Sequence, residues 1–395
     1  MTSSPTPESA DDVSLDWGFR DMGGDAEPPA ARAGADRSPE MLLGEVVGGM
    51  HDTLPPAWSF YIAEIAIAAN EHRTRAAVEL PDGRLLPLTV DPAVLRAAAA
   101  HRELTAGDAP WMWLRITEHR GQQPQIAAFD GFVGAPPDHL LFPPASYLTD
   151  VSMSAGVATP LWLLAHVHAT GAQLRAASVA AEAPPAECVH PADELPPLPL
   201  LWPRFAALSA IFAAVDAFDG PRMTSSVGIF RGELGGCTLT RLPRGRAVLS
   251  GGSDHSALMT AAYLGHLEPP DFYRGAPAWV SNIVLDERAA AGMLTFCYWW
   301  SEGRWSRAHL TGPPEWTPIA ELTPAVPGVW TSTTTAELVR STLAQAGIEV
   351  SAQAATDYVG QVGSGDIRPE LLASLPHPPA SSAEGFTVLD LAQSW

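Results

Sequence analysis

Three runs in the first third of the chain alternate apolar and polar residues, and they carry its clearest structural signal. They are FYIAEIAIAANEH (60–72), RTRAAVELPDGRLLPLTV (73–90) and WMWLRITEHR (111–120). Successive side chains of a strand point to opposite faces of its sheet, so this alternation is typical of half-buried strands. The sequence Pro81-Asp82-Gly83 interrupts the second run and is typical of a tight turn. This region therefore predicts an antiparallel sheet.

Two helical patterns accompany these strands. Residues 39–50 place apolar side chains at helical spacing and end in glycines. Residues 91–107 begin with Asp91, continue with Pro92 at the first helical position and end at Gly107, as expected of one capped helix. We therefore predict an N-terminal α+β domain over 41–150.

The middle of the chain changes in composition. Helical patterns in 159–182 and 204–220, the second with a stop at Gly220, predict a helical connector over 151–222, which a Pro-rich stretch at 183–203 interrupts. Residues 1–40 lack any periodicity and predict a disordered acidic arm.

Short strand patterns return after the connector. A C-terminal α+β domain is predicted over 223–335, and 336–395 is expected to hold short helices and a tail. The turn Ser301-Glu302-Gly303 joins the last two strands. The predicted fold class is α+β, with two antiparallel-sheet domains joined by the helical, Pro-rich connector. The six expected strands are VGIFRG (227–232), CTLTRL (237–242), RAVLSG (246–251), WVSNIVL (279–285), MLTFCYWW (293–300) and RWSRAHL (304–310).

Charge and cysteine content limit the classes of partner and cofactor. The chain has 44 acidic and 23 basic residues, a formal net charge of −21 that repels nucleic-acid phosphates. Cys188, Cys237 and Cys297 are far apart and follow no metal-binding spacing, so we expect free thiols, no zinc and no cofactor. The longest apolar run, 161–169, is too short to cross a bilayer. A cytoplasmic protein that binds neither nucleic acid nor membrane is expected.

The tetrapeptide Ser253-Asp254-His255-Ser256 places two hydroxyls, a carboxylate and an imidazole directly after Gly251 and Gly252. A catalytic triad holds its base between hydroxyl and carboxylate, an arrangement that adjacent residues do not normally reach. A strand that turns on the two glycines into a helix capped by Ser253 or Asp254 explains the residues better. Two alternatives stay open: a polar patch that faces a ligand or partner, and a hydrolase or transferase site around Asp254 and His255.

His166 and His168 form an H-x-H pair, which can chelate a metal when it lies on a strand. The surrounding pattern is helical, and a helix turns the two side chains apart. No second ligand motif supports a metal site, so none is predicted.

Aromatic residues cluster in the last two predicted strands. Alternation along a strand predicts that Trp299 and one of its neighbours point to opposite faces of the sheet. Core packing is the first interpretation. The alternative is an exposed patch for a protein partner, because Trp and Arg are enriched at the energetic centres of interfaces. The residues of this alternative patch are Trp299, Trp300, Arg304, Trp305 and Arg307.

The segment 42–150 resembles the YezG-like immunity-protein domain as it occurs in actinobacteria. The resemblance rests on LPPAW (54–58), PDGRLLPL (81–88), DPAVLRAAAAHRELT (91–105), WMWLRITEH (111–119) and PPDHLLFPPASYLTD (136–150). Residues 244–279 also resemble a stretch of uncharacterised actinobacterial proteins. This second resemblance carries no information about activity.

The first resemblance implies a non-enzymatic immunity or regulatory protein that neutralises a toxin by protein–protein contact. Its expected partner is a protein, for example a co-encoded toxin. An enzyme whose site is assembled from distant residues, and a structural subunit of a larger assembly, remain alternatives.

Overall fold

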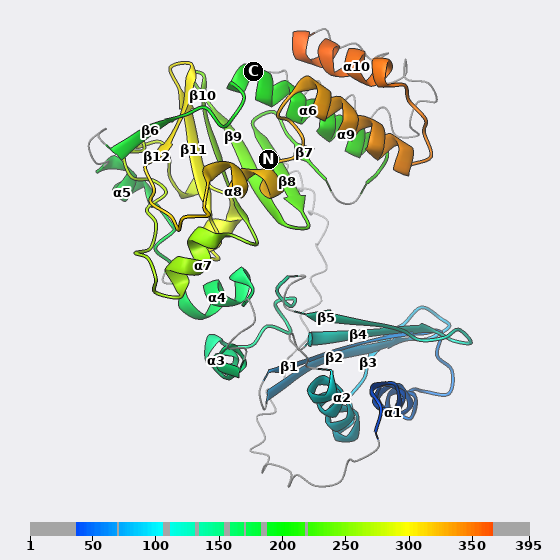
Figure 1. Ribbon diagram of the computed structural model, residues 1–395. Helices are drawn as coiled ribbons and strands as arrows, with labels where there is room; N and C mark the ends of the chain where they lie inside the picture. The colour runs from blue at the N-terminus through cyan, green and yellow to red at the C-terminus, as the bar shows by residue number, and fades with distance from the viewer. Residues whose placement is uncertain are drawn as a thin grey trace, which may run out of the picture. The chain divides into compact units, whose positions relative to one another are not determined.

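The strands in the described part of the protein form two separate antiparallel sheets, of five and of seven strands (Figure 1). The computed structural model describes residues 37–68, 71–105, 111–130, 134–153, 159–169, 171–182, 188–217 and 220–365. The expected arm up to residue 36, Gly107 and the tail after 365 lie outside these ranges. The α+β class and the two antiparallel sheets are confirmed.

The five-stranded sheet has the order β3-β2-β1-β4-β5, and every neighbouring pair is antiparallel. The turn at Pro81-Asp82-Gly83 closes with a hydrogen bond from the Leu80 N–H to the Arg84 carbonyl, 2.9 Å long. The strands are β1 Phe60–Ala68, β2 Glu71–Glu79, β3 Leu85–Pro87, β4 Trp111–His119 and β5 Gln125–Asp130.

Two helices cover one face of this sheet, α1 (Pro39–His51) and α2 (Pro92–Leu104) (Figure 1). As predicted, Asp91 caps α2, because its carboxylate accepts a hydrogen bond of 2.7 Å from the Ala93 N–H. The side chains at alternate positions of β1, among them Tyr61 and Ile65, pack into the core beneath the helices. The amphipathic pattern thus encodes both the helices and the buried face of the sheet.

One end of the opposite face is covered by residues that follow β5. Two helices lie in this segment, α3 (Pro144–Met153) and α4 (Leu161–His168). Side chains from this segment pack on Ala66, Ala68, Met112 and Trp113. They are Leu140, Phe142, Tyr147, Trp162 and Leu163.

The seven-stranded sheet has the order β6-β12-β11-β10-β9-β8-β7. The predicted turn at Ser301-Glu302-Gly303 joins β11 to β12, with Glu302 and Gly303 at φ 53° and 78°. The strands are β6 Val189–Ala192, β7 Arg222–Met223, β8 Val227–Gly232, β9 Gly235–Leu242, β10 Arg246–Ser253, β11 Phe296–Ser301 and β12 Arg304–Ala308.

Part of the expected connector joins this second sheet. Besides the short helix α5 (Ala177–Ala181), the segment contributes β6, which pairs with β12 at the sheet edge, and the helix α6 (Leu198–Ala214). The helix begins earlier than expected and continues through Pro203, and it ends at Ala214 rather than at Gly220. Pro199 lies in the first turn of α6, where proline is tolerated, whereas Pro203 lies inside the helix and removes one of its backbone hydrogen bonds.

The helix α6 packs side by side with α9 (Ser332–Gln345) and α10 (Ala352–Ser364), and the three share a core with one face of the seven-stranded sheet (Figure 1). The Tyr358 hydroxyl donates a hydrogen bond of 2.9 Å to the Ala207 carbonyl, which ties α10 to α6. The short helices expected in 336–395 are thus part of this core as far as residue 365.

The other face of the sheet carries α7 (Ala257–Tyr263) and a long irregular segment. The expected strand at 279–285 is wrong, because this stretch holds a 3₁₀ turn at Asn282–Val284. Val280 and Val284 are buried whereas Ile283 is 90% exposed, a spacing that suits a turn and not an alternating strand. A second 3₁₀ turn, Glu287–Ala289, and the helix α8 (Pro318–Ala325) follow.

Candidate functional site

The tetrapeptide at 253–256 does connect a strand to a helix, but its cap is not the expected residue. Ser253 is the last residue of β10, and its hydroxyl accepts a hydrogen bond of 3.2 Å from the His255 N–H. Ser256 is the cap of α7, because its hydroxyl accepts a hydrogen bond of 3.2 Å from the Met259 N–H. The prediction that Ser253 or Asp254 caps the helix is therefore wrong.

The two glycines before the tetrapeptide lie inside β10 and form no turn. A Cβ on Gly251 would lie 2.2 Å from the Gly236 carbonyl oxygen, and one on Gly252 would lie 2.2 Å from the Met293 carbonyl oxygen. Glycine is thus required there because the neighbouring backbone approaches closely, not because the chain bends.

A cleft of about 310 Å³ opens beside Asp254 and His255. Its polar wall also includes Arg231, Glu287 and Arg288. Its apolar wall includes Pro160, Trp162, Ala291 and Met293. The structure thus brings two of the sequence-predicted site residues together with three charged residues that the sequence analysis missed.

Ion pairs organise the polar wall of the cleft. Asp254 Oδ1 lies 2.5 Å from Nη1 of Arg288. Arg231 lies 3.0 Å from Oδ2 of Asp286 and 3.0 Å from Oε1 of Glu287. The buried Asp286 Oδ2 also accepts a hydrogen bond of 2.7 Å from the Thr238 hydroxyl. The Arg231 guanidinium is therefore held in place by carboxylates on two sides.

These contacts do not assemble a nucleophile and a general base. Ser256 Oγ donates to a buried carboxylate, Ser253 Oγ holds the local turn, and Asp254 pairs with Arg288. Among the described residues, none forms a hydrogen bond with the exposed His255 ring. Acid–base catalysis by a Ser–His pair needs the two side chains within hydrogen-bond reach.

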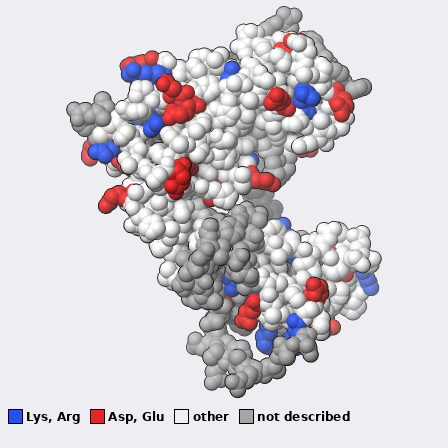
Figure 2. All heavy atoms as spheres, in the orientation of Figure 1, with Lys and Arg blue, Asp and Glu red and all other residues white. Residues whose placement is uncertain are grey.

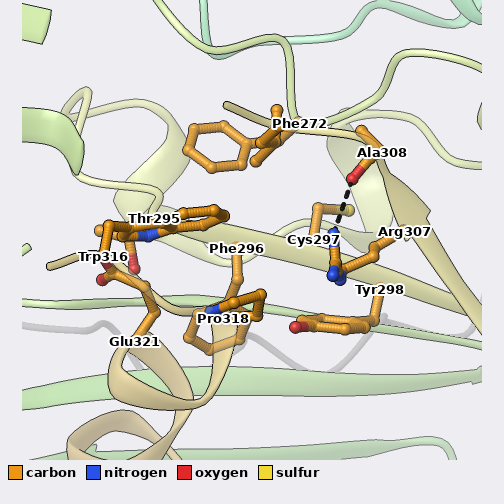
Figure 3. Close-up of a pocket in the computed structure, with 11 residues that line it drawn as sticks. Phe272, Thr295, Phe296, Cys297, Tyr298, Arg307, Ala308, Trp316, Pro318 and Glu321 are labelled. Carbon is orange, nitrogen blue, oxygen red and sulfur yellow. Dashed lines mark hydrogen bonds between the residues drawn. The ribbon is translucent and has the colours of Figure 1, made fainter. Parts of the chain in front are cut away.

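The carboxylate that Ser256 reaches belongs to Glu321, which lines a small pocket with Thr295 and Trp316 (Figure 3). The Ser256 hydroxyl donates to Glu321 Oε1 at 2.7 Å. Burial, with 3% of the residue exposed, raises the pKa of the Glu321 carboxyl above its usual value, and hydrogen bonding, from Ser256 first, opposes this in part. The pocket of about 10 Å³ has room for about one water molecule. Ser256 therefore has a structural role that links α7 to α8.

The clustered tryptophans lie in the core. Trp299, Trp300 and Trp305 are 2%, 7% and 2% exposed. Trp299 packs on the α7 side of the sheet and Trp300 on the α6 side, so their predicted opposite orientation is confirmed. Because both faces of this sheet are covered, an exposed aromatic patch at these residues is wrong and core packing is confirmed. Arg304 is exposed, and Arg307 pairs with Glu194 at 3.0 Å.

The histidines and cysteines show no shared site. His166 and His168 lie on the helix α4, as predicted, and His166 Nε2 lies 2.8 Å from the Phe142 carbonyl oxygen. No group of three or more metal-binding side chains occurs within the described ranges. Cys188, Cys237 and Cys297 are free thiols.

A second candidate surface was not predicted: the part of the five-stranded sheet that faces away from α1 and α2. Residues that pair directly on antiparallel strands point to the same face. The register joins Phe60 to Glu79 and His119, and Ile62 to Ala77 and Thr117. We call this surface the open face. It comprises Phe60, Ile62, Glu64, Arg75, Glu79, Leu85, Arg115, Thr117, His119 and Gln125.

The open face combines apolar side chains with basic and acidic ones, the latter being Glu64 and Glu79. Leu85 is 54% exposed, Arg75 is exposed, and Phe60 and Ile62 are half-buried. The Arg115 guanidinium lies over the Trp113 ring at 5.0 Å. These side chains form a surface of the type that is enriched at protein interfaces. The signal in the sequence was β1 itself, because FYIAEIAIA is apolar on both of its faces.

Glu64 neutralises part of this positive charge. It is 4% exposed, and its carboxylate lies 2.9 Å from Arg115 and 2.8 Å from His139. Arg75, which faces Glu64 on the neighbouring strand, has no ion pair with any described residue. In the view of Figure 2, acidic and basic side chains are interspersed on a mostly uncharged surface. The exposed Arg75 is therefore a charge that a partner can neutralise.

Replacing Ser256 by alanine is expected to lower the free energy of unfolding by about 0.5–2 kcal/mol, because the cap of α7 is lost. The loss also leaves Glu321 without its hydroxyl donor. Replacing the exposed His255 by alanine is expected to change stability by less than about 0.5 kcal/mol. Urea unfolding of both variants checks this. An equal loss in the two variants would show that Ser256 is not the cap.

No model of a known protein family matches the chain, and no curated protein matches it. Within the described ranges, none of the helices has the length and apolar character needed to cross a bilayer.

Proposed function

We propose that this protein is non-enzymatic and acts by binding another protein through the open face of its five-stranded sheet. The proposed role is that of an immunity or regulatory protein, and the proposed partner is a co-encoded toxin that it neutralises by contact. The proposal includes a cytoplasmic location, which the three free cysteines support.

The observation that carries this proposal is the exposed Arg75, which has no ion pair among the described residues, beside exposed and half-buried apolar side chains on one sheet face. Leu85 and Phe60 lie in one row across the strands, with Glu79 between them, and Arg75, Glu64 and Arg115 lie in another. An apolar centre next to arginines is typical of the few residues that dominate binding energy. A partner surface with an apolar patch and a carboxylate opposite Arg75 complements this arrangement.

The side chains at the cleft beside Asp254 also favour binding over catalysis. The Asp254 carboxylate is paired with Arg288, and both serine hydroxyls of the tetrapeptide have structural partners. Asp254 and the two serines are therefore engaged in holding the local fold, whereas the exposed His255 ring has no hydrogen-bond partner among the described residues that would make it part of a catalytic pair.

Substitution of the open face tests the proposal. We expect Arg75→Glu and Leu85→Glu each to weaken binding to the protein encoded by the neighbouring gene by about tenfold or more, because both side chains lose a complementary contact. Titration calorimetry with the purified pair measures the affinity. Inhibition of the toxin by the two variants should fall in parallel.

Two control variants make the same substitutions, arginine to glutamate and leucine to glutamate, at exposed positions outside the open face. Arg340→Glu reverses an exposed charge on α9, and Leu104→Glu replaces a side chain that is 55% exposed at the end of α2. Both should bind the partner as the unmodified protein does. Binding that is unchanged by Arg75→Glu and Leu85→Glu would reject the open face as the interface.

A further inference from the structure

The cleft beside the tetrapeptide is large enough to hold a small molecule. Its volume of about 310 Å³ lies at the lower end of the range of ligand sites, about 300–1,000 Å³. Its floor is built on β10 and on the 3₁₀ turn at Glu287–Ala289, elements that are fixed by the seven-stranded sheet. The helix α4 supplies the opposite wall through Trp162.

Two opposite charges on the polar wall keep free hydrogen-bonding capacity. Asp254 uses only Oδ1 in its pair with Arg288, and Oδ2 has no partner in the described part of the chain. The Arg288 side chain uses only Nη1 there, which leaves Nε and Nη2 without partners among the same residues. The two side chains are 29% and 15% exposed, and their free atoms remain accessible to solvent and so to a ligand in the cleft.

The remaining charges of the polar wall disfavour the binding of a ligand with a large net charge. Arg231 donates to Asp286, Glu287 and two carbonyl oxygens, which occupies its guanidinium. The exposed Glu287 repels a second anionic group, whereas Arg288 repels a second cationic group. A molecule with one anionic and one cationic group close together complements Arg288 and Asp254 at once.

The apolar wall indicates what the rest of the ligand must be. Trp162, Met293 and Pro160 line the cleft together with the charged residues. An apolar side chain of a few carbon atoms would remove these surfaces from water, with a gain of about 25 cal/mol for each Å² buried. The wall therefore favours a ligand with an apolar body attached to its charged head.

We propose that this cleft binds a free α-amino acid with an apolar side chain. The carboxylate pairs with the free nitrogens of Arg288, the ammonium group donates to Asp254 Oδ2, and the side chain packs against Trp162 and Met293. The site is separate from the open face, and binding at it does not require the protein partner.

Calorimetry on the full chain with L-leucine, L-methionine and L-phenylalanine as probes tests the proposal. At least one of the three is expected to bind with a dissociation constant below about 1 mM. Its N-acetyl derivative, which lacks the cationic group, and its amide, which lacks the anionic group, should each bind about tenfold more weakly or worse.

Three variants complete the test. Asp254→Asn and Arg288→Gln each remove one charge and should weaken binding of the amino acid about tenfold or more. Ala291→Phe fills the cleft without altering the ion pair and should abolish binding while the protein stays folded, and Arg340→Gln, far from the cleft in sequence, should bind as the unmodified protein does. The proposal is overturned if none of the probes binds, if the N-acetyl derivative binds equally well, or if Ala291→Phe binds unchanged.

Discussion

Replacing Trp305 by alanine is expected to lower the free energy of unfolding by about 3–5 kcal/mol, the range for truncation of a large buried aromatic side chain. Trp305 is 2% exposed and packs edge-to-face against Trp300, with ring centroids 5.4 Å apart. Its indole N–H also donates a hydrogen bond of 2.8 Å to the Pro196 carbonyl oxygen. Equilibrium unfolding in urea measures the loss.

The neighbouring Arg304 provides the control for this prediction. It is exposed on the same strand, and Arg304→Ala should change the free energy of unfolding by less than about 0.5 kcal/mol. A loss of under about 1 kcal/mol for Trp305→Ala would mean that the side chain is not in the core, and the exposed-patch interpretation would return.

Gly251→Ala is expected to destabilise the fold by about 3 kcal/mol or more, at or beyond the upper end of the usual cost of overpacking. The added Cβ would lie 2.2 Å from the Gly236 carbonyl oxygen and 2.7 Å from the Cys237 Cα. Both are backbone atoms of β9, so relief requires β9 and β10 to separate. Thermal and urea unfolding, together with the yield of folded protein, measure the effect.

Gly44→Ala on α1 makes the same chemical change with the opposite expected sign. No atom lies within 4 Å of a Cβ built on Gly44, and the residue is exposed on the helix. Alanine there should raise the free energy of unfolding by about 0.4–1 kcal/mol, because it reduces the entropy of the unfolded chain. Tolerance of Gly251→Ala would contradict the close packing of β9 and β10.

The sequence was most informative where a single face of an element is buried. The runs that became β2 and β4 alternate because α1 and α2 cover one face of their sheet. Asp91 followed by Pro92 indicated the start of α2 for a local chemical reason. The Asp91 carboxylate accepts a hydrogen bond from the Ala93 N–H, which has no partner within the helix. Such signals depend on neighbouring residues in the sequence, and they can be read without the tertiary structure.

Signals that depend on tertiary contacts were misread. Ser253, Asp254 and Ser256 are all good capping residues, and the choice of Ser256 follows from a chain path that also brings it to Glu321. The stretch 279–285 is rich in apolar residues because it packs over the sheet, not because it pairs within it. In both cases a local propensity was outweighed by contacts with residues distant in the sequence.

The candidate sites were harder still to predict from the sequence. Arg231, Glu287 and Arg288 meet Asp254 only because β8 and the 3₁₀ turn at 287–289 lie beside the end of β10. No spacing in the sequence relates these residues. The open face was hidden for another reason, since a strand that is apolar on both faces predicts burial of both, and one end of this face is left uncovered.

Hydroxyl-radical footprinting of the complex with the protein encoded by the neighbouring gene tests the proposed function most directly. We expect labelling of Phe60 and Leu85 on the open face to fall on complex formation, while Ile283, which is 90% exposed in the other part of the chain, is labelled at its free rate. Unchanged labelling of Phe60 and Leu85 in a stable complex, or protection confined to Ile283, would contradict partner binding at the open face.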